Sequence, residues 1–230
     1  MLKTVKSVPA IGARSRSAGR AATRQAARAD GSRANILAMA TREFSEKGFT
    51  GARVDEIAER IDTSKRMIYY YFGSKEGLYR AVLEQCYTQV RQIDTSLDLD
   101  RLAPAAALRQ LVYVTFDYHN KHPDFVRIVM NENINKGAQI GTVSSIKTRA
   151  KVIISMLQKL INRGASTGVF RADIDPVDLH MAISALCFYN VSNRYTFGRV
   201  FQRNMTAPGA LASRRETVAN IIERWCCIKP

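Results

Sequence analysis

The sequence predicts an all-α protein, in which an N-terminal three-helix helix-turn-helix domain precedes a larger helical domain. Apolar residues recur at helical spacing over most of the chain, and no segment alternates apolar and polar residues as a strand would. Of the 230 residues, 46% are hydrophobic and 24% are charged, which excludes a chain disordered throughout. The longest apolar runs, such as Val152-Ile153-Ile154, fall far short of the roughly 18–20 residues that cross a bilayer, so we expect a soluble protein.

The first three helices are predicted between residues 33 and 72. The first begins at about Arg33 and ends at Gly48, a typical C-cap residue. Its apolar residues are Ile36, Leu37, Ala40 and Phe44. The second helix has two turns, and its apolar residues are Val54, Ile57, Ala58 and Ile61. Asp62-Thr63-Ser64 forms a turn, in which Ser64 caps a third helix from Lys65 to Phe72. Two short helices joined in this way are typical of a helix-turn-helix.

Helical periodicity continues after Gly73-Ser74, where a fourth helix is predicted to begin at Lys75. Asp175 and Pro176 are a typical N-cap and a typical first helical residue. Further helices are expected over residues 105–120, 123–133, 144–163 and 176–191, and after Pro208-Gly209. Gly164 to Gly168 is expected to end the helix over 144–163. The chain therefore divides into a basic flexible arm (1–32), a helix-turn-helix domain (33–79) and a larger helical domain (80–230).

Positive charge is concentrated at the N-terminus. The formal net charge of the chain is +15, of which residues 1–33 carry +7, residues 34–85 none and residues 86–230 +8. Such a distribution indicates a polyanionic partner, either nucleic acid or an anionic membrane surface. Arg16, Arg20, Arg24 and Arg28 recur every four residues, so the arm is expected to become helical against a polyanion and to be mobile alone.

The outward face of the third helix suits a DNA groove. Arg66 has the geometry for a bidentate pair with guanine, and Met67 suits a thymine methyl group. Lys65 is placed for a phosphate or a base, and the hydroxyls of Tyr69 and Tyr70 for phosphate oxygens. A competing interpretation makes Tyr69-Tyr70-Tyr71 a core patch, but three consecutive residues span roughly 300° of a helix, so at least one faces outward. For Arg66 the residues alone leave base contact and simple solvation evenly balanced.

Cations on both sides of this helix suit further phosphate contacts. Ser74 and Lys75 begin the fourth helix, whose N-terminal amides attract anions, and Arg53 lies at the start of the second helix. The basic arm is placed to follow the minor groove or the phosphate backbone, with a solubilising tail as the equally weighted alternative.

Residues 33–87 contain the motifs Phe44-Ser-Glu-Lys-Gly-Phe49, Val54-Asp-Glu-Ile-Ala58, Ser64 and Ile68-Tyr-Tyr-Tyr-Phe-Gly-Ser-Lys75-Glu-Gly-Leu78. With these motifs, this part of the sequence resembles the N-terminal domain of TetR-family transcriptional regulators. The resemblance covers about a quarter of the chain. The C-terminal half is similar to the ligand-binding domain of one TetR subgroup, on His122-Pro-Asp-Phe-Val-Arg127, Asn131-Glu-Asn133, Ser192-Asn-Arg-Tyr-Thr196 and Ala207-Pro-Gly-Ala-Leu211.

The resemblance implies a bacterial, cytoplasmic homodimer, associated with the nucleoid through its operator, that represses target genes. It implies release from DNA when a small molecule binds the C-terminal ligand-binding and dimerisation domain. It also argues against a transit peptide, which the Arg- and Ala-rich arm imitates. The DNA-binding residues that it implies, together with the N-cap residue, are Arg53, Ser64, Lys65, Arg66, Met67, Tyr69, Tyr70 and Lys75.

Three positions depart from the family pattern without removing the DNA-binding interpretation. Ala52 and Arg53 stand where Ser or Thr is frequent, so Arg53 is expected to replace a hydroxyl–phosphate contact. Asp62 stands where a turn glycine is usual, and Asp tolerates the left-handed conformation. Ile61 replaces a small residue, which indicates slightly different packing between the two helices.

A TetR-like C-terminal domain implies an effector pocket among its middle helices. Arg127 or His119 facing this pocket favours an anionic ligand, and the aromatic residues favour an aromatic one. The candidate lining residues are Tyr113, Phe116, His119, Arg127, Met130, Asn131, Phe188 and Tyr189, about two in three of which are expected to be ordinary core.

The last two helices are the dimer interface that the resemblance implies. A two-fold dimer places its recognition helices about 34–36 Å apart and predicts a palindromic operator. The candidate interface residues are Leu186, Tyr189, Leu211, Val218, Ile222 and Trp225.

The alternatives are an enzyme, an effector-independent DNA-binding regulator or activator, and a protein that binds membranes through its arm. The sequence contains neither a Gly-rich phosphate loop nor a nucleophile elbow, so an enzyme is disfavoured and no cofactor is expected. His119 and His122 lack a convincing third ligand, so no metal is expected. The four cysteines, including Cys226-Cys227, form no CxxC pair and are expected to be reduced and mostly buried.

Overall fold

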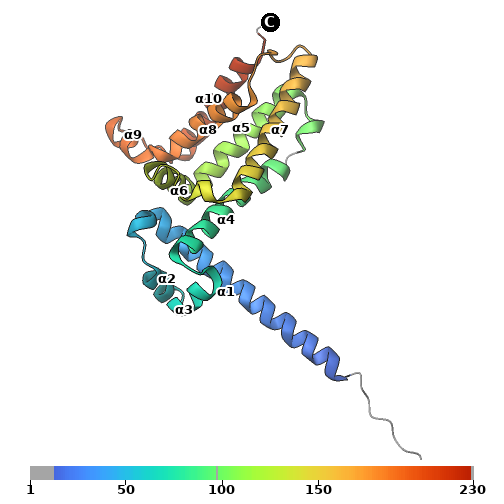
Figure 1. Ribbon diagram of the computed structural model, residues 1–230. Coiled ribbons are helices and arrows are strands. Elements are labelled where there is room, and N and C mark those ends of the chain that lie inside the picture. The colour runs from blue at the N-terminus through green and yellow to red at the C-terminus, as the bar shows by residue number, and fades with distance from the viewer. Residues whose placement is uncertain (1–12, 97, 229–230) are drawn as a thin grey trace, which may run out of the picture.

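The computed structural model describes residues 13–96 and 98–228, with side chains described for 31–90 and 98–228. It is helical throughout, without a strand in the described ranges, as the sequence predicts. Two short 3-10 helices, η1 (Leu99–Arg101) and η2 (Ile140–Thr142), join longer elements. The α-helices are α1 (Ala13–Gly51), α2 (Val54–Arg60), α3 (Lys65–Phe72), α4 (Lys75–Ser96), α5 (Pro104–Lys121), α6 (Pro123–Ile134), α7 (Ser144–Ser166), α8 (Pro176–Ser192), α9 (Arg194–Val200) and α10 (Pro208–Cys226) (Figure 1).

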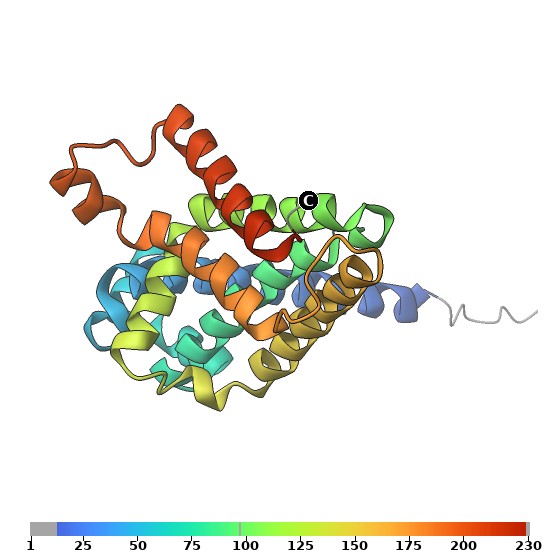
Figure 2. The ribbon, with the colours of Figure 1, turned by 90° about the horizontal axis from the view of Figure 1, so that it is seen from above.

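The helices form two groups that share α4 and α6. Helices α2 and α3 lie at one end of the molecule, beside α1 and the first turns of α4, whereas α5, α7, α8 and α10 form a bundle at the other end (Figure 1). Helix α6 packs against α1 on one side and against α5 and α8 on the other. Seen from above, α9 and its connection to α10 project beyond the bundle (Figure 2).

Two clusters of buried apolar side chains correspond to these groups. The first runs from Ile36 and Phe44 of α1 through Ile68 of α3 to α4 and α6, where it includes Ile128. The second fills the bundle and includes Leu157, which is fully buried. The boundary expected after residue 79 lies inside α4, so the two parts of the chain share a single continuous helix.

The capping residues expected from the sequence are confirmed. The Ser64 hydroxyl accepts a hydrogen bond from the Met67 N–H at 3.2 Å. Asp62 adopts the left-handed conformation, with φ 50°, and Gly48 interrupts α1 with φ 68°. The Asp175 carboxylate accepts hydrogen bonds from the N–H groups of Val177 and Asp178 at 2.7 and 3.0 Å.

Helix boundaries differ from expectation in three places. Helix α1 begins at Ala13, about twenty residues before Arg33, because Ala and Arg are strong helix formers; residues 1–12 of the arm lie outside the described residues. The short α9 is missing from the predicted helices. Helix α7 continues through Gly164 to Ser166, and Gly168, with φ 69°, lies in the turn that follows it.

Gly164 lets α7 approach the Phe170 ring closely. A Cβ atom at Gly164 would lie 2.0 Å from Cδ2 of Phe170, which is itself 1% exposed. Gly164 is therefore required by packing, inside a helix where glycine is otherwise unfavourable by about 1 kcal/mol relative to alanine.

We expect Gly164→Ala to lower the free energy of unfolding by about 1–3 kcal/mol, since overpacking exceeds the gain in helix propensity. The matched control is Gly209→Ala in α10, where a Cβ would meet no described atom within 4 Å. The control should leave stability unchanged or raise it. Urea unfolding followed by circular dichroism measures both, and equal stabilisation by the two substitutions would contradict the close-packing role.

His119 of α5 is buried in the middle of the molecule. Its side chain is 5% exposed. Burial lowers the pKa of its imidazole to about 4, and His180 acts in the same direction. In the unfolded chain the pKa is about 6.5, so below this pH the unfolded state takes up a proton that the folded state does not.

Stability should therefore fall as the pH drops from about 6.5 toward 4, and His119 should account for about 2 kcal/mol of the loss at pH 5. We expect His119→Phe to lose less stability than the unmodified protein between pH 7 and pH 5. Urea unfolding at the two pH values measures the difference between the proteins. The same loss in both would show that His119 carries no such penalty.

Candidate nucleic-acid interface and ligand cavity

Helix α3 has one fully buried side chain, and the half-buried Tyr71 and Phe72 pack against the same apolar cluster. Ile68 is fully buried, whereas Met67, Tyr69 and Tyr70 are 38%, 36% and 78% exposed. Arg66 is exposed as well. The structure therefore places the expected groove-facing residues at the surface, and two of the three consecutive tyrosines face solvent.

Lys65, the remaining residue of this face, is held against α2. Its Nζ lies 3.0 Å from Oδ1 of Asp55 and 5.9 Å from the centre of the Tyr69 ring. Hydrogen bonding to Asp55 raises the pKa of Lys65 above its ordinary value. Both partners of this ion pair are about half exposed, and solvent screens such pairs, so Asp55 restrains Lys65 only weakly.

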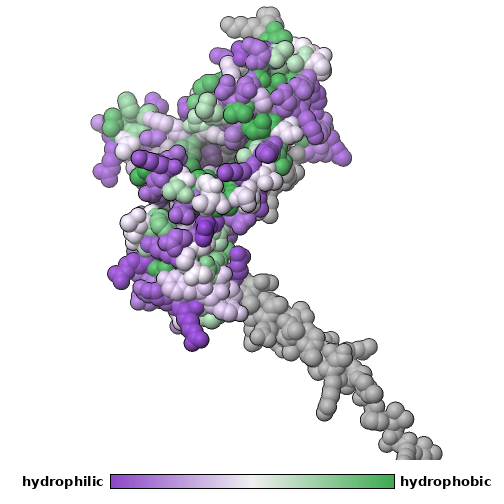
Figure 3. Space-filling view, in the orientation of Figure 1, coloured by the Kyte–Doolittle hydropathy of each residue, from purple (hydrophilic) through white to green (hydrophobic). Residues whose placement is uncertain are grey.

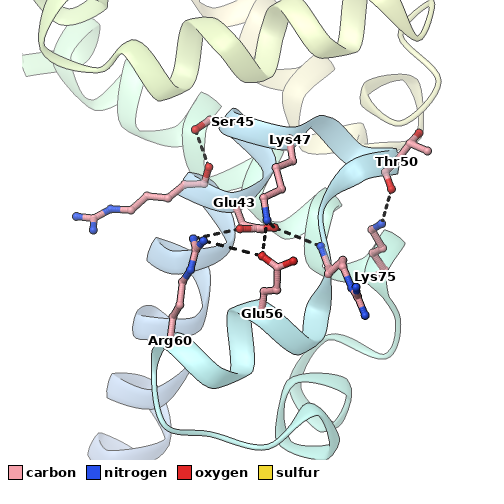
Figure 4. A network of polar contacts seen from close by, with 9 residues as sticks. Glu43, Ser45, Lys47, Thr50, Glu56, Arg60 and Lys75 are labelled. Atoms are coloured by element: carbon pink, nitrogen blue, oxygen red, sulfur yellow. Dashed lines mark hydrogen bonds and ion pairs between the residues drawn. The ribbon is translucent and has the colours of Figure 1, made fainter.

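The two flanking cations differ in their surroundings. Arg53 is the N-cap residue of α2 and is exposed. Lys75, at the first turn of α4, donates a hydrogen bond from Nζ to the Thr50 carbonyl at 3.3 Å and lies 5.1 Å from the centre of the Phe49 ring (Figure 4). Lys75 therefore joins α4 to the end of α1 in this structure.

A fully buried carboxylate ties α2 to α1. Glu43 of α1 has no exposed surface and lies 2.9 Å from Nζ of Lys47 and 3.1 Å from a guanidinium nitrogen of Arg60 (Figure 4). It also accepts the Arg53 N–H at 3.4 Å. Lys47 forms a second ion pair with Glu56 of α2. Because a buried charge is tolerated only when paired, this network fixes the position of α2, a role for Glu43 that was not predicted from the sequence.

The junction between α3 and α4 is tight. A Cβ atom at Gly77 would lie 1.9 Å from the Phe72 carbonyl oxygen at the end of α3. The Ser74 hydroxyl accepts the Gly77 N–H at 3.1 Å, and Gly73 adopts φ 76°. The position of α3 is therefore set directly by the first turn of α4.

A cavity of about 170 Å³ lies among α4, α5, α6, α7 and α8. Its polar lining groups are Thr115, His119, His180 and Ser184. The remaining lining residues are Tyr87, Val90, Leu111, Phe125, Val129, Ile153, Leu157, Ile183 and Phe188. Of the residues expected to bind an effector, His119 and Phe188 line it. Helical periodicity does not predict the contributions of α4 and α7, because it identifies an inward face without saying which cavity that face meets.

Three residues that were expected to bind an effector instead pack in an apolar core or link α5 to α10. Phe116 is 1% exposed and belongs to the core of the bundle, and Met130 packs against the first apolar cluster. The Tyr113 hydroxyl bonds to Glu216 of α10 at 2.8 Å, and Arg215 lies 3.8 Å from the centre of its ring. None of these three side chains lines the cavity.

The other three are occupied elsewhere. Arg127 donates a hydrogen bond to the Tyr195 hydroxyl at 3.1 Å. Asn131 donates from Nδ2 to the Phe44 carbonyl at 3.3 Å, which joins α6 to α1. Tyr189 is 45% exposed and lines a second hollow, of about 320 Å³, between α8, α9 and α10.

The expected interface residues of α8 and α10 differ in how exposed they are. Val218 and Ile222 are buried in the bundle of their own chain, at 0% and 1% exposure, and so are unavailable to a partner. Leu186, Leu211 and Trp225 are half-buried. Tyr189, the remaining expected residue, is 45% exposed, and Met181 of α8 and Ile221 of α10 are 62% and 45% exposed.

No cluster of His, Cys, Asp and Glu in the described part of the chain could hold a metal ion. In the same ranges, every helix is too short or too polar to span a bilayer. Of the four cysteines, Cys86, Cys187 and Cys226 are buried, and burial raises the pKa of each thiol to about 12.

Comparison with known proteins matches both parts of the chain. Residues 36–82 match the bacterial regulatory proteins of the tetR family, and residues 104–222 match a tetracyclin repressor-like C-terminal domain. The chain is 39% identical over 172 residues to the HTH-type transcriptional repressor NicS of Pseudomonas putida, which covers 75% of this chain and 81% of NicS. It is 31% identical over 150 residues to the HTH-type transcriptional regulator RutR of Escherichia coli K12, which covers 65% and 69% of the two chains.

The fold agrees with these matches. A tetR-family regulatory protein from Rhodococcus RHA1 superposes with a TM-score of 0.66 at 19% identity, over 86% of this chain and 98% of that one. The paired helix-turn-helix and C-terminal matches together span most of the described chain. The chain therefore belongs to the TetR family of DNA-binding transcriptional regulators.

Proposed function

We propose that this protein is a ligand-responsive repressor that binds a palindromic operator as a homodimer and leaves it when a small molecule occupies the cavity. The observation that carries the proposal is the arrangement of buried and exposed side chains on α3. One buried residue, Ile68, anchors this helix, while Lys65, Arg66, Met67 and the first two tyrosines are exposed together. The cavity lies beside the second half of α4, and the first turn of this helix is directly beside α3.

Each exposed group of α3 has a stated role in this proposal. Arg66 reads a guanine, and Met67 contacts a thymine methyl group. Lys65, Tyr69, Tyr70, Arg53 and Lys75 position the protein on phosphates, which carry no base information. Ser64 acts by holding the first turn of α3, since its hydroxyl accepts the Met67 N–H.

The cavity and α3 are connected through two helices. Tyr87 and Val90 of α4 line the cavity, and the same helix begins at the tight junction with Phe72. Phe125 and Val129 of α6 also line it, and Asn131 on the same helix bonds to Phe44 of α1. A molecule that shifts these walls therefore displaces α3 relative to a partner α3, provided that it binds the DNA-free arrangement more tightly.

Dimerisation is assigned to α8 and α10. These helices carry the exposed apolar residues Met181, Tyr189 and Ile221. Both helices belong to the bundle at the end of the molecule away from α3 (Figure 1). A two-fold axis there sets two recognition helices about 34–36 Å apart, one turn of DNA. The arm, residues 1–32, adds sequence-independent contacts to phosphates.

We expect selection of duplex DNA by the purified full-length protein to yield a palindrome with half-sites one turn apart. Removing residues 1–32 should keep the selected sequence and weaken its binding. The slope of log affinity against log salt should fall by about 0.9 for each phosphate that the arm neutralises. Arg33, which lies 5.3 Å from the centre of the Phe72 ring, is retained in this variant. Enrichment of no sequence, with binding that disappears without the arm, would contradict a base-reading α3.

We expect Arg66→Ala to lower affinity for the selected site by about 1–3 kcal/mol and to relax the preference at one base position. Lys75→Ala should lower the affinity for all DNA sequences by the same factor. The matched control is Arg199→Ala, which removes an exposed arginine from α9 and should leave DNA binding unchanged. Titrations against the site and its single-base variants measure each effect. Uniform weakening by Arg66→Ala would make Arg66 a phosphate contact instead.

A further inference from the structure

The walls of the cavity fit a single aromatic ring. The His119 ring stacks at 21° and 5.8 Å from the Phe125 ring and meets the Phe188 ring edge-on at 6.0 Å. Aliphatic side chains such as Ile153, Leu157 and Ile183 complete the wall. The volume of about 170 Å³ is close to that of an apolar protein cavity of about 150 Å³ that holds benzene. One ring with a small substituent therefore fills this space.

The lining disfavours a charged ligand. Among the described residues that line the cavity, none is Lys, Arg, Asp or Glu. Burial lowers the pKa of His119 to about 4, so this imidazole is neutral near pH 7 and supplies no positive charge to an anion. Because an ion loses its hydration on entering such a site and meets no countercharge from His119, an uncharged molecule is favoured.

His119 also supplies an unmet hydrogen-bonding group. Its side chain is 5% exposed, and Nδ1 has no hydrogen-bond partner among the described residues. Thr115, another polar lining residue, already donates its hydroxyl to the Leu111 carbonyl at 2.8 Å. Buried polar atoms are nearly always paired, so an unpaired nitrogen on a residue that lines the cavity indicates the His119 imidazole as the group with which a ligand would pair. A hydroxyl suits either tautomer of the imidazole, because it both donates and accepts.

We propose that the cavity binds an uncharged molecule with one aromatic ring and a single hydroxyl or similar polar group, which forms a hydrogen bond with the imidazole of His119. This inference rests on the proposed function, since it names the chemical class of the effector. It replaces the anionic ligand that His119 and Arg127 suggest at the level of sequence, because burial lowers the pKa of His119 well below 7 and Arg127 donates a hydrogen bond to Tyr195 instead of lining the cavity.

Phenol, toluene and benzoate test this proposal with the full-length protein at pH 7. The first two differ in the hydroxyl, and the third brings a negative charge on the same ring. Dissociation constants from calorimetric titration should rank phenol at least about tenfold tighter than toluene, a difference of about 1.4 kcal/mol. Benzoate should bind more weakly than phenol.

His119→Phe keeps a ring of similar shape but lacks the nitrogen, so it should remove the preference for phenol over toluene. The matched control is His122→Phe. His122 is exposed, stacks on Tyr118 at 4.3 Å and does not line the cavity, so the control should keep the preference. Circular dichroism checks that both variants fold. If His119→Phe does not fold, the three ligands on the unmodified protein still decide the proposal.

Each result that contradicts the expectation overturns a specific part of the proposal. Tighter binding of benzoate overturns the uncharged class, equal binding of phenol and toluene overturns the role of His119, and no binding of phenol overturns the class as a whole. Operator release is measured separately on the selected DNA. Binding of phenol without release keeps the ligand class and refutes regulation by it. Release by a molecule of another class, without phenol binding, keeps the proposed function and refutes this inference.

Discussion

The structure depends above all on the packing of α4 into both parts of the molecule. Leu78, Tyr79, Val82 and Leu83 of its first half are fully buried beside α1, α3 and α6. Further along, Tyr87 and Val90 line the cavity. A single helix transmits displacement along its axis because its backbone hydrogen bonds are continuous. For this reason the proposed recognition surface and the cavity border the same continuous helix, although different residues form them.

The helix-turn-helix is too small to be stable without this framework. Helices α2 and α3 have seven and eight residues, and isolated helices shorter than about 12–15 residues are marginal in water. Ile57 and Ile68 anchor them by apolar burial. The Glu43 network adds a directional constraint, since a buried carboxylate accepts only an arrangement that keeps Lys47 and Arg60 in place. Few buried contacts thus leave most of α3 available at the surface.

The surface near α9 is more apolar than the surface around α2 and α3. The space-filling view shows hydrophobic residues over α9, whereas polar residues dominate around α2 and α3 (Figure 3). Tyr195, Val200 and Phe201 of this region are 61%, 72% and 60% exposed. This contrast agrees with a protein-facing role for the α8–α10 end and a nucleic-acid-facing role for the opposite end.

The sequence by itself determined the all-α class, the caps at Ser64 and Asp175, and the exposed face of α3, because these follow from local spacing and short-range hydrogen bonding. Only the tertiary structure decided what the inward faces meet. His119 and Phe188 line the cavity with residues from α4 and α7, whereas Phe116 and Asn131, on equally periodic helices, contact the core and α1. Periodicity records that a side chain is buried, but its partners are set by how distant helices pack.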